Sequence, residues 1–330
     1  AEIAFLSAEA ASRPSLVGIP GQTDHRFDGP DHGGVRVLVE GQFAFDVVDL
    51  ESDFSRYKLL ILPDVIAVDD ALKAKIEAYV GKGGRMLLTG RSGIDPEKGF
   101  VFDVGAEWHG TSEMAAGDYL LPIDALRADF VDDPLFMYLP SERIKVTSGA
   151  SLGAVYEPYF DRTPKHFSGH IHTPSRPDPS AYAAGVEKGG YLYLAHPIFS
   201  AYHKAGAVAM LEIAEKAIRR ALGKAPLVTT TLPRAGRVTV RSQEGKGRDV
   251  VHLLHANPAL RGNLRGANVQ PIQDIVPVHD VAVAVEPRGE VAAVRVVPEG
   301  RELPFEVAEG RVTFTLPKLE SHAMIEIAYR

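Results

Sequence analysis

Cysteine is absent from the 330 residues of the chain, which excludes disulfide bonds, thiolate metal sites and a cysteine nucleophile. Basic residues are not in excess: the formal net charge is -7, whereas a protein that binds nucleic acid needs a basic surface for the phosphates. No apolar run approaches the roughly 18 residues that cross a bilayer. We therefore predict neither nucleic acid nor a membrane as a partner, and we expect a cytoplasmic location, with which the lack of cysteine is compatible.

Motifs of common α/β enzymes are missing as well. A dinucleotide-binding G-x-G-x-x-G would stand between the first strand and its helix, where the chain reads SAEAASRPS, and no P-loop occurs. In TGRSGID, Ser92 sits one residue beyond the position of a nucleophile elbow, and the glycine spacing of such an elbow fails. We interpret this stretch as a glycine-rich turn after a strand, and we predict no cofactor.

Apolar material for a core is ample. Hydrophobic residues make up 45% of the chain and charged residues 24%, which is typical of a soluble globular protein, and the length suits two domains. The chain begins with AEIAFLS, which reads directly as a buried strand and contains no charged-then-apolar signal segment. We therefore interpret the chain as a fragment or a processed product.

Residues 45–90 are the stretch around which the first part of the chain is organised. The apolar run YKLLILP predicts a buried strand, and Asp69 and Asp70 then begin a helix whose apolar residues recur with helical spacing. Glycines end this helix, and RMLLTG supplies the next buried strand. A strand, a helix and a strand over about 35 residues predict two parallel strands that are covered on both faces.

The other elements up to the end of the first domain follow from similar patterns. In chain order we expect a strand at 2–7, a long loop at 8–34, a helix at 35–42, irregular short strands and turns at 92–149, a polar and aromatic segment at 155–174, a strand at 189–199 and one long helix at 200–223. The irregular segments matter most, because α/β sheets bind their ligands at the carboxyl ends of parallel strands.

After residue 223 the pattern changes from helical spacing to short β-branched runs. Seven such runs follow, separated by turns at roughly ten-residue intervals, which is typical of a small antiparallel sandwich. The runs are LVTTTL, RVTVRS, DVVHLLHA, HDVAVAV, VAAVRVV, RVTFTLP and AMIEIAY. We therefore predict an α/β domain at 1–223 and an all-β domain at 224–330.

The most informative residues for function are the histidines of YEPYFDRTPKHFSGHIHTP, residues 156–174. His166, His170 and His172 lie there with Arg162 among four aromatic side chains. Neutral imidazoles can bind a metal, but the segment HFSGHIH holds no carboxylate and Pro164 disfavours a regular helix. A solvated loop with incidental histidines is a second interpretation. We favour a third, a polar ligand such as a sugar, whose hydroxyls need paired donors and acceptors while its C–H faces pack on aromatic rings.

Two smaller clusters of the same kind occur in other irregular segments. Trp108 stands beside His109, and Asp31 stands beside His32. The tryptophan fits a structural core position as well as it fits a ligand contact. Glycosidases need two carboxyl groups about 5–10 Å apart, but the chain has 43 aspartates and glutamates and no motif that selects a pair. We predict no catalytic residue and no metal ligand, and we keep both clusters as candidate substrate contacts.

These residues resemble a known family. The stretch FDVVDLESDFSRYKLLILPDVIAVDDALKAKIEAYVGKGGRMLLTG is similar to the β-galactosidase trimerisation domain of family 42 enzymes, and YFDRTPKHFSGHIHTP and YLAHPIFSAYHKAG resemble glycosyl hydrolases allied to family 151 α-L-fucosidases. The resemblance implies a flavodoxin-like or class I glutamine amidotransferase-like parallel sheet with helices on both faces, followed by a β-sandwich. In these families both domains follow a catalytic (β/α)8 barrel, and this chain contains no such barrel.

The resemblance implies that the chain is the C-terminal region of a glycoside hydrolase that acts on fucose- or galactose-containing saccharides. Its expected partners are a saccharide substrate, its own N-terminal barrel and further copies of itself in a trimer, and the catalytic carboxylates are expected in the barrel. The alternative is a non-catalytic binding or structural module with an amidotransferase-like fold. A third interpretation, an independent hydrolase that uses Ser92, is disfavoured by the glycine spacing.

Overall fold

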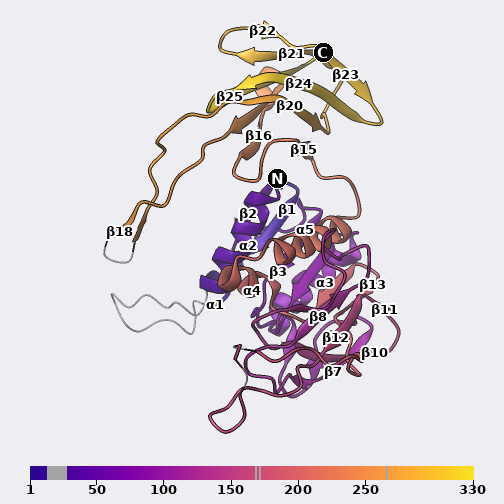
Figure 1. Ribbon diagram of the computed structural model, residues 1–330. Coiled ribbons are helices and arrows are strands. Elements are labelled where there is room, and N and C mark those ends of the chain that lie inside the picture. Colours follow the sequence, from indigo (N-terminus) through magenta and orange to yellow (C-terminus); the bar gives the residue numbers. More distant parts are fainter. Residues whose placement is uncertain (13–27, 168, 171, 265–266) are drawn as a thin grey trace. The chain divides into compact units, whose positions relative to one another are not determined.

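The computed structural model describes residues 1–12, 28–167, 169–170, 172–264 and 267–330 (Figure 1). They divide into two compact units. We call residues 2–37 and 45–225 the α/β unit, and residues 1, 38–44 and 226–330 the β unit. None of the helices in the described part of the chain is long and apolar enough to cross a membrane.

A seven-stranded mixed sheet is the centre of the α/β unit. Its strands lie in the order β11-β13-β14-β4-β3-β1-β2. The five strands from β14 to β2 are parallel, whereas β13 and β11 add to one edge in the antiparallel sense. The bounds are β1 Ile3–Leu6, β2 Phe45–Val48, β3 Leu59–Leu62, β4 Arg85–Thr89, β11 Ala150–Ser151, β13 Gly185–Lys188 and β14 Tyr191–Leu194. The expected parallel sheet is thus confirmed for five strands, and the antiparallel edge was not predicted.

The predicted strand–helix–strand unit is confirmed. Helix α3, Asp70–Gly81, connects β3 to β4, and these two strands pair in parallel. Asp69 is the N-cap, and its carboxylate accepts a hydrogen bond of 2.8 Å from the backbone N–H of Leu72. The expected stripe of the helix is buried, including Ile76, which is fully inaccessible to solvent.

Helices cover both faces of the sheet because successive strand residues point to opposite sides. On one face Leu6 of β1 shares a core with Ile76 of α3. On the other face the ring of Phe5 meets Phe199 of α4, with 6.0 Å between centroids, and α5 packs on β4 and β14. Helix α4 is Ile198–Ala205 and α5 is Val208–Leu222.

Two expectations about helices were wrong. The single helix expected at 200–223 is two helices, because Gly206 takes a left-handed conformation with φ 63° and ends α4. The loop expected at 8–34 contains α1, Ala8–Ser12, and the start of α2, Asp28–Glu40, while residues 13–27 lie outside the described part of the chain. Asp31 explains α1: its carboxylate accepts hydrogen bonds from the N–H groups of Ala8 (2.6 Å) and Glu9 (3.1 Å), and a cap from a distant helix leaves no local signal.

The irregular segments of the α/β unit form short antiparallel pieces, as expected. Strands β7 and β10 pair with each other, β8 pairs with both β9 and β12, and β5 pairs with β6. Their bounds are β5 Ile94–Asp95, β6 Gly99–Phe100, β7 Ala106–Thr111, β8 Tyr119–Pro122, β9 Leu135–Phe136, β10 Glu142–Val146 and β12 Gly153–Tyr156.

The β unit is built from two antiparallel sheets that share one hydrophobic core. The four-stranded sheet has the order β15-β20-β24-β23, and the five-stranded sheet has the order β16-β17-β25-β21-β22. All seven predicted runs are strands. The bounds are β15 Val228–Thr230, β16 Arg237–Gln243, β17 Arg248–Leu254, β18 Gly262–Leu264, β19 Ala267–Val269, β20 Val278–Val285, β21 Val291–Val297, β22 Arg301–Glu302, β23 Phe305–Ala308, β24 Arg311–Leu319 and β25 His322–Tyr329, with a short 3-10 helix at Glu244–Lys246.

Candidate functional site

The carboxyl ends of the parallel strands carry a buried acidic residue, Asp64, two residues after the end of β3. Its carboxylate accepts hydrogen bonds from the Thr89 hydroxyl (2.6 Å) and from both the hydroxyl (2.6 Å) and the backbone N–H (2.7 Å) of Ser200. Burial raises the pKa of Asp64 above its usual range despite these donors. Asp64 also has a left-handed backbone, with φ 50°. It therefore connects the ends of β3 and β4 to the first turn of α4.

A second buried acid, Glu142, opens β10. The indole Nε1–H of Trp108 donates to its carboxylate at 2.7 Å, and the Thr111 hydroxyl donates at 3.1 Å. The Arg91 guanidinium lies 5.6 Å from the centroid of the Trp108 ring. Burial raises the pKa of Glu142, although Trp108, Arg91 and Thr111 each act to lower it. The hydrogen bond to this buried carboxylate thus holds the Trp108 ring in place, and its role as a ligand contact stays a prediction.

A third buried group joins Asp118 to His196, which follows β14. The His196 Nε2 lies 2.6 Å from the Asp118 carboxylate, and both side chains are almost inaccessible to solvent. The Ser141 hydroxyl donates to the other carboxylate oxygen at 2.7 Å. Burial raises the pKa of Asp118, but His196 and the serine hydroxyls lower it by more in total, so the pKa lies below its ordinary value. Sequence patterns did not single out these residues, although His196 and Asp64 each stand two residues after the end of a parallel strand.

The histidine-rich segment forms a ribbon whose two sides are joined near its base. Tyr159 donates its N–H to the carbonyl of Pro174 at 3.2 Å, and the Thr173 hydroxyl donates to the carbonyl of Phe160 at 3.0 Å. The end of the ribbon is exposed and includes Arg162 and Phe167, whose side chain is 68% exposed. The ribbon therefore presents charged and aromatic groups to solvent.

The three predicted histidines occupy different places on this ribbon. His166 is exposed and stacks on Phe160 with ring centroids 3.6 Å apart. His172 lies at the base, stacked on Phe136 at 4.0 Å, and burial followed by the charge of His170 lowers its pKa. His170 is exposed beside it. In the described residues no group of three or more His, Cys, Asp or Glu side chains is arranged to hold a metal ion.

A cavity of about 420 Å³ lies beside the base of the ribbon. It is lined by Tyr159 together with Glu157, Arg176, Pro177, Asp178, Pro179 and Ser180. Arg143 pairs with Glu157 at 2.7 Å and lies over the Tyr182 ring at 4.7 Å. The cavity thus combines an aromatic face with carboxylates and a guanidinium, the groups that a polar ligand needs. The sequence predicted the segment but none of these lining residues.

The remaining predicted contacts lie elsewhere. His109 is partly exposed, 3.8 Å from Glu107 and 6.4 Å between ring centroids from Tyr182. Asp31 caps helix α1, and the exposed His32 lies 5.9 Å from the His203 ring. The structure therefore does not bring all the predicted contacts into one site, and their role in binding stays a prediction.

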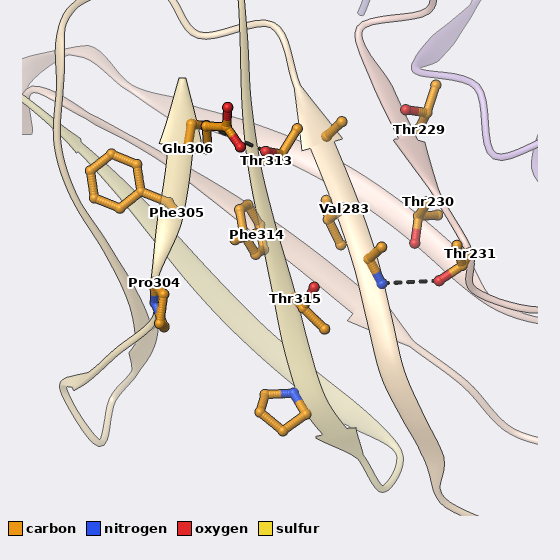
Figure 2. Close-up of a pocket in the computed structure, with 13 residues that line it drawn as sticks. Thr229, Thr230, Thr231, Val283, Pro304, Phe305, Glu306, Thr313, Phe314 and Thr315 are labelled. Atoms are coloured by element: carbon orange, nitrogen blue, oxygen red, sulfur yellow. Dashed lines mark hydrogen bonds between the residues drawn. The ribbon is translucent and has the colours of Figure 1, made fainter. Parts of the chain in front are cut away.

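The β unit has a groove of its own, with a volume of about 700 Å³, on the four-stranded sheet (Figure 2). Its floor carries small side chains in cross-strand register, such as Thr313 opposite Ala284 and Thr315 opposite Ala282. Phe305 stands on the edge strand β23. The floor is uncharged apart from Glu306, which distinguishes it from an ordinary solvent-facing sheet.

Comparison with known proteins gives consistent relatives. Residues 36–129 match the model of the "Beta-galactosidase trimerisation domain". The β-galactosidase GanA of Bacillus subtilis is 30% identical over 136 residues, which are 39% of this chain and 20% of that protein. The β-galactosidase BglY of Alicyclobacillus acidocaldarius is 36% identical over 81 residues, which are 24% of this chain and 12% of that protein.

Solved structures extend the likeness to the whole chain. An α-L-fucosidase isoenzyme 2 from Paenibacillus thiaminolyticus matches with a TM-score of 0.90 and 35% identity, over 100% of this chain and 49% of that one. A β-galactosidase from Bacillus circulans sp. alkalophilus matches with a TM-score of 0.62 and 14% identity, over 99% of this chain and 41% of that one, and shows the fold alone. The chain thus spans about half the length of the fucosidase, and the predicted resemblance is confirmed: residues 36–129 match the trimerisation domain of β-galactosidases.

Proposed function

We propose that this chain is the C-terminal region of a glycoside hydrolase of the α-L-fucosidase or β-galactosidase type, which assembles the enzyme and completes a saccharide pocket. The match to the fucosidase carries this proposal, because it extends over the whole chain with a TM-score of 0.90. A TM-score this high means that the chain and the matching part of the fucosidase have the same architecture. The chain spans only about half of that enzyme. The catalytic carboxylates are therefore expected in a barrel outside these residues.

The finer fold assignment belongs to the same proposal. The parallel strands lie in space as second, first, third, fourth and fifth in chain order, which is the order of flavodoxin-like sheets. Asp64, with its left-handed backbone, stands after the third of them. We propose an amidotransferase-like trimerisation domain at 1–223 and a β-sandwich domain at 224–330. A cytoplasmic location stays a prediction.

The chemistry of the buried groups supports a non-catalytic role for the sheet. Asp64, Glu142 and Asp118 are buried, and each carboxylate already accepts hydrogen bonds from neighbouring side chains. Ser92 is fully buried, and its hydroxyl accepts from the N–H of Ile66 at 3.0 Å. A group that must meet a substrate cannot be enclosed in this way, so an independent hydrolase that uses Ser92 is disfavoured.

The ribbon is the surface that we assign to the saccharide. It exposes imidazole and guanidinium donors beside aromatic rings, and it adjoins the cavity at Tyr159. Sugars need both kinds of contact. In a trimer such a ribbon would reach a neighbouring barrel. We propose His166, His170 and His172 as the contacts, with Arg162 as a further donor.

The experiment compares this chain with the longer enzyme that includes the barrel. We expect the chain alone to lack turnover of p-nitrophenyl fucoside and galactoside, and light scattering to give a trimer. Robust turnover by the chain alone would overturn the placement of the catalytic groups, and a monomer at micromolar concentration would count against the trimer. An intact protein that trimerises but binds no saccharide would favour the alternative, a non-catalytic structural module.

His170→Ala in the longer enzyme tests the ribbon. We expect weaker saccharide binding with unchanged thermal stability, because His170 is exposed. His279→Ala, which removes an exposed histidine from β20 in the β unit, is the matched control and should leave affinity unchanged. Equal affinities of the two variants would remove His170 from the site.

A further inference from the structure

Two histidines face each other on the outer side of the five-stranded sheet of the β unit. His252 lies in β17 and His322 begins β25, and these strands pair in the antiparallel sense. The Nδ1 of His252 and the Nε2 of His322 are 3.2 Å apart, and the two rings are parallel to within 10°. One ring must donate a proton to the other at this distance, so the pair shares a single proton between two nitrogen lone pairs.

We propose that this pair is an open binding site for a copper ion, which replaces the shared proton. Imidazole nitrogens bind such ions at about 2.0–2.1 Å. Copper(II) prefers tetragonal sites, in which two adjacent nitrogens at that distance from the ion are roughly 2.9 Å apart, so the 3.2 Å pair has to close by only about 0.3 Å. The rings need only turn so that their lone pairs converge beside the line that joins them. His322 is exposed and His252 is half-buried, so both have room to turn.

The register places a methionine, a candidate third donor, on the same face. Met324 is directly opposite His252 in the register of β17 and β25, and it is two residues from His322 on one strand. Directly opposite residues of an antiparallel pair have Cβ atoms about 4.5–5.5 Å apart, and residues two apart on a strand share a face. Thioethers select soft ions, and copper has the highest affinity for nitrogen ligands among the divalent ions of its row. The donor set therefore favours copper over zinc.

The surrounding charges are mixed. Arg241 of β16 is near enough to His252 to act on its charge, and it opposes a bound cation. In the neighbouring cross-strand row, Arg241 is opposite Val250, which in turn is opposite Glu326. The Glu326 carboxylate already pairs with Arg248 and Arg295, so its charge is balanced by these two groups. Replacement of Arg241 by glutamine should consequently tighten copper binding, because it removes a repulsive charge without touching a ligand.

Titration of the 330-residue protein with Cu²⁺ by calorimetry and electron paramagnetic resonance tests the site. We expect one equivalent that shows coupling to two nitrogens. His252→Asn and His322→Asn should each weaken this equivalent by at least roughly ten-fold, the lower end of what even indirect partners of a metal contribute. Met324→Leu should weaken it less, and Arg241→Gln should strengthen it.

His279→Asn is the control, because it removes an exposed histidine from the other sheet and should retain the equivalent. Circular dichroism and thermal unfolding of each variant show whether it is folded, and the strengthening expected for Arg241→Gln cannot arise from misfolding. The proposal is overturned if both histidine variants bind Cu²⁺ as tightly as the unmodified protein, or if the control loses the same equivalent.

Discussion

Asp64 provides the sharpest test of how the sheet is held together. Asp64→Ala removes the acceptor of the Ser200 N–H, a fixed backbone donor, while the Thr89 and Ser200 hydroxyls can turn to other partners. A buried donor left unsatisfied costs about 1–3 kcal/mol. Aspartate already carries a Cβ at φ 50°, so alanine adds little further backbone strain. We therefore expect the free energy of unfolding of the α/β unit to fall by about 1–3 kcal/mol.

The assay is urea unfolding followed by tryptophan fluorescence. Trp108 is the single tryptophan of the chain and lies in the α/β unit, so its emission reports that unit. With a slope of roughly 1–3 kcal/mol per molar urea, the midpoint should fall by about 1 M. Asp64→Gly removes the same acceptor without the backbone strain and should cost about 1–2 kcal/mol less.

Two controls make the result decisive. Glu77→Ala removes an exposed carboxylate of α3 that pairs with Lys73 at 3.9 Å, and exposed pairs contribute only about 0–1 kcal/mol. Asp64→Asn keeps one oxygen acceptor and a residue that tolerates a left-handed backbone, so its loss should be intermediate. If Asp64→Ala unfolds within about 0.5 kcal/mol of the unmodified protein, the network does not stabilise the fold and the reasoning fails.

Three further predictions concern other residues of the α/β unit. Gly206→Ala should destabilise the α/β unit by about 1 kcal/mol, with Gly206→Asn less harmful, because the left-handed end of α4 favours glycine; urea unfolding measures both. Glu142→Ala should cost more than Glu142→Gln in the same assay, since only glutamine still accepts from the Trp108 indole. His172 should make the protein less stable as the pH falls below 6.5, because its pKa is lowered in the folded state and the unfolded chain therefore binds the proton more readily. Unfolding curves measured at several pH values should show this loss of stability, and His172→Phe should remove it.

Local patterns predicted the elements that are defined by neighbouring residues. Asp69 caps α3 within the same turn, and the β-branched runs after residue 223 carry their period with them, so both were correct. Helix α1 escaped prediction because Asp31, which caps it, comes from α2. The break at Gly206 escaped because a glycine within an apolar helical pattern does not reveal its backbone angle. Contacts between distant segments are set by the packed fold, and a window of sequence cannot contain them.

The candidate site shows the same limit in its chemistry. The sequence selected histidines by their proximity along the chain, but the fold separates them: His166 stacks on Phe160, whereas His172 packs on Phe136 at the base of the ribbon. The sequence did not indicate Arg176 and Asp178, which line the cavity, because the prolines around them predict only a turn. Proximity in sequence selected one ribbon of the fold, but it could not predict how the fold separates the histidines within it.

At the carboxyl edge of the sheet, the protein's own side chains hydrogen-bond to one another. Ligands of α/β folds usually enter at this edge because free N–H groups and loops converge there. In this chain Asp64 takes the Ser200 N–H, and His196 and Ser141 are both bonded to Asp118. Each internal bond stabilises the fold and removes a donor that a ligand would need. Under the proposed function, a saccharide contact would therefore come from groups outside this network, and the ribbon with its adjoining cavity is where we propose it.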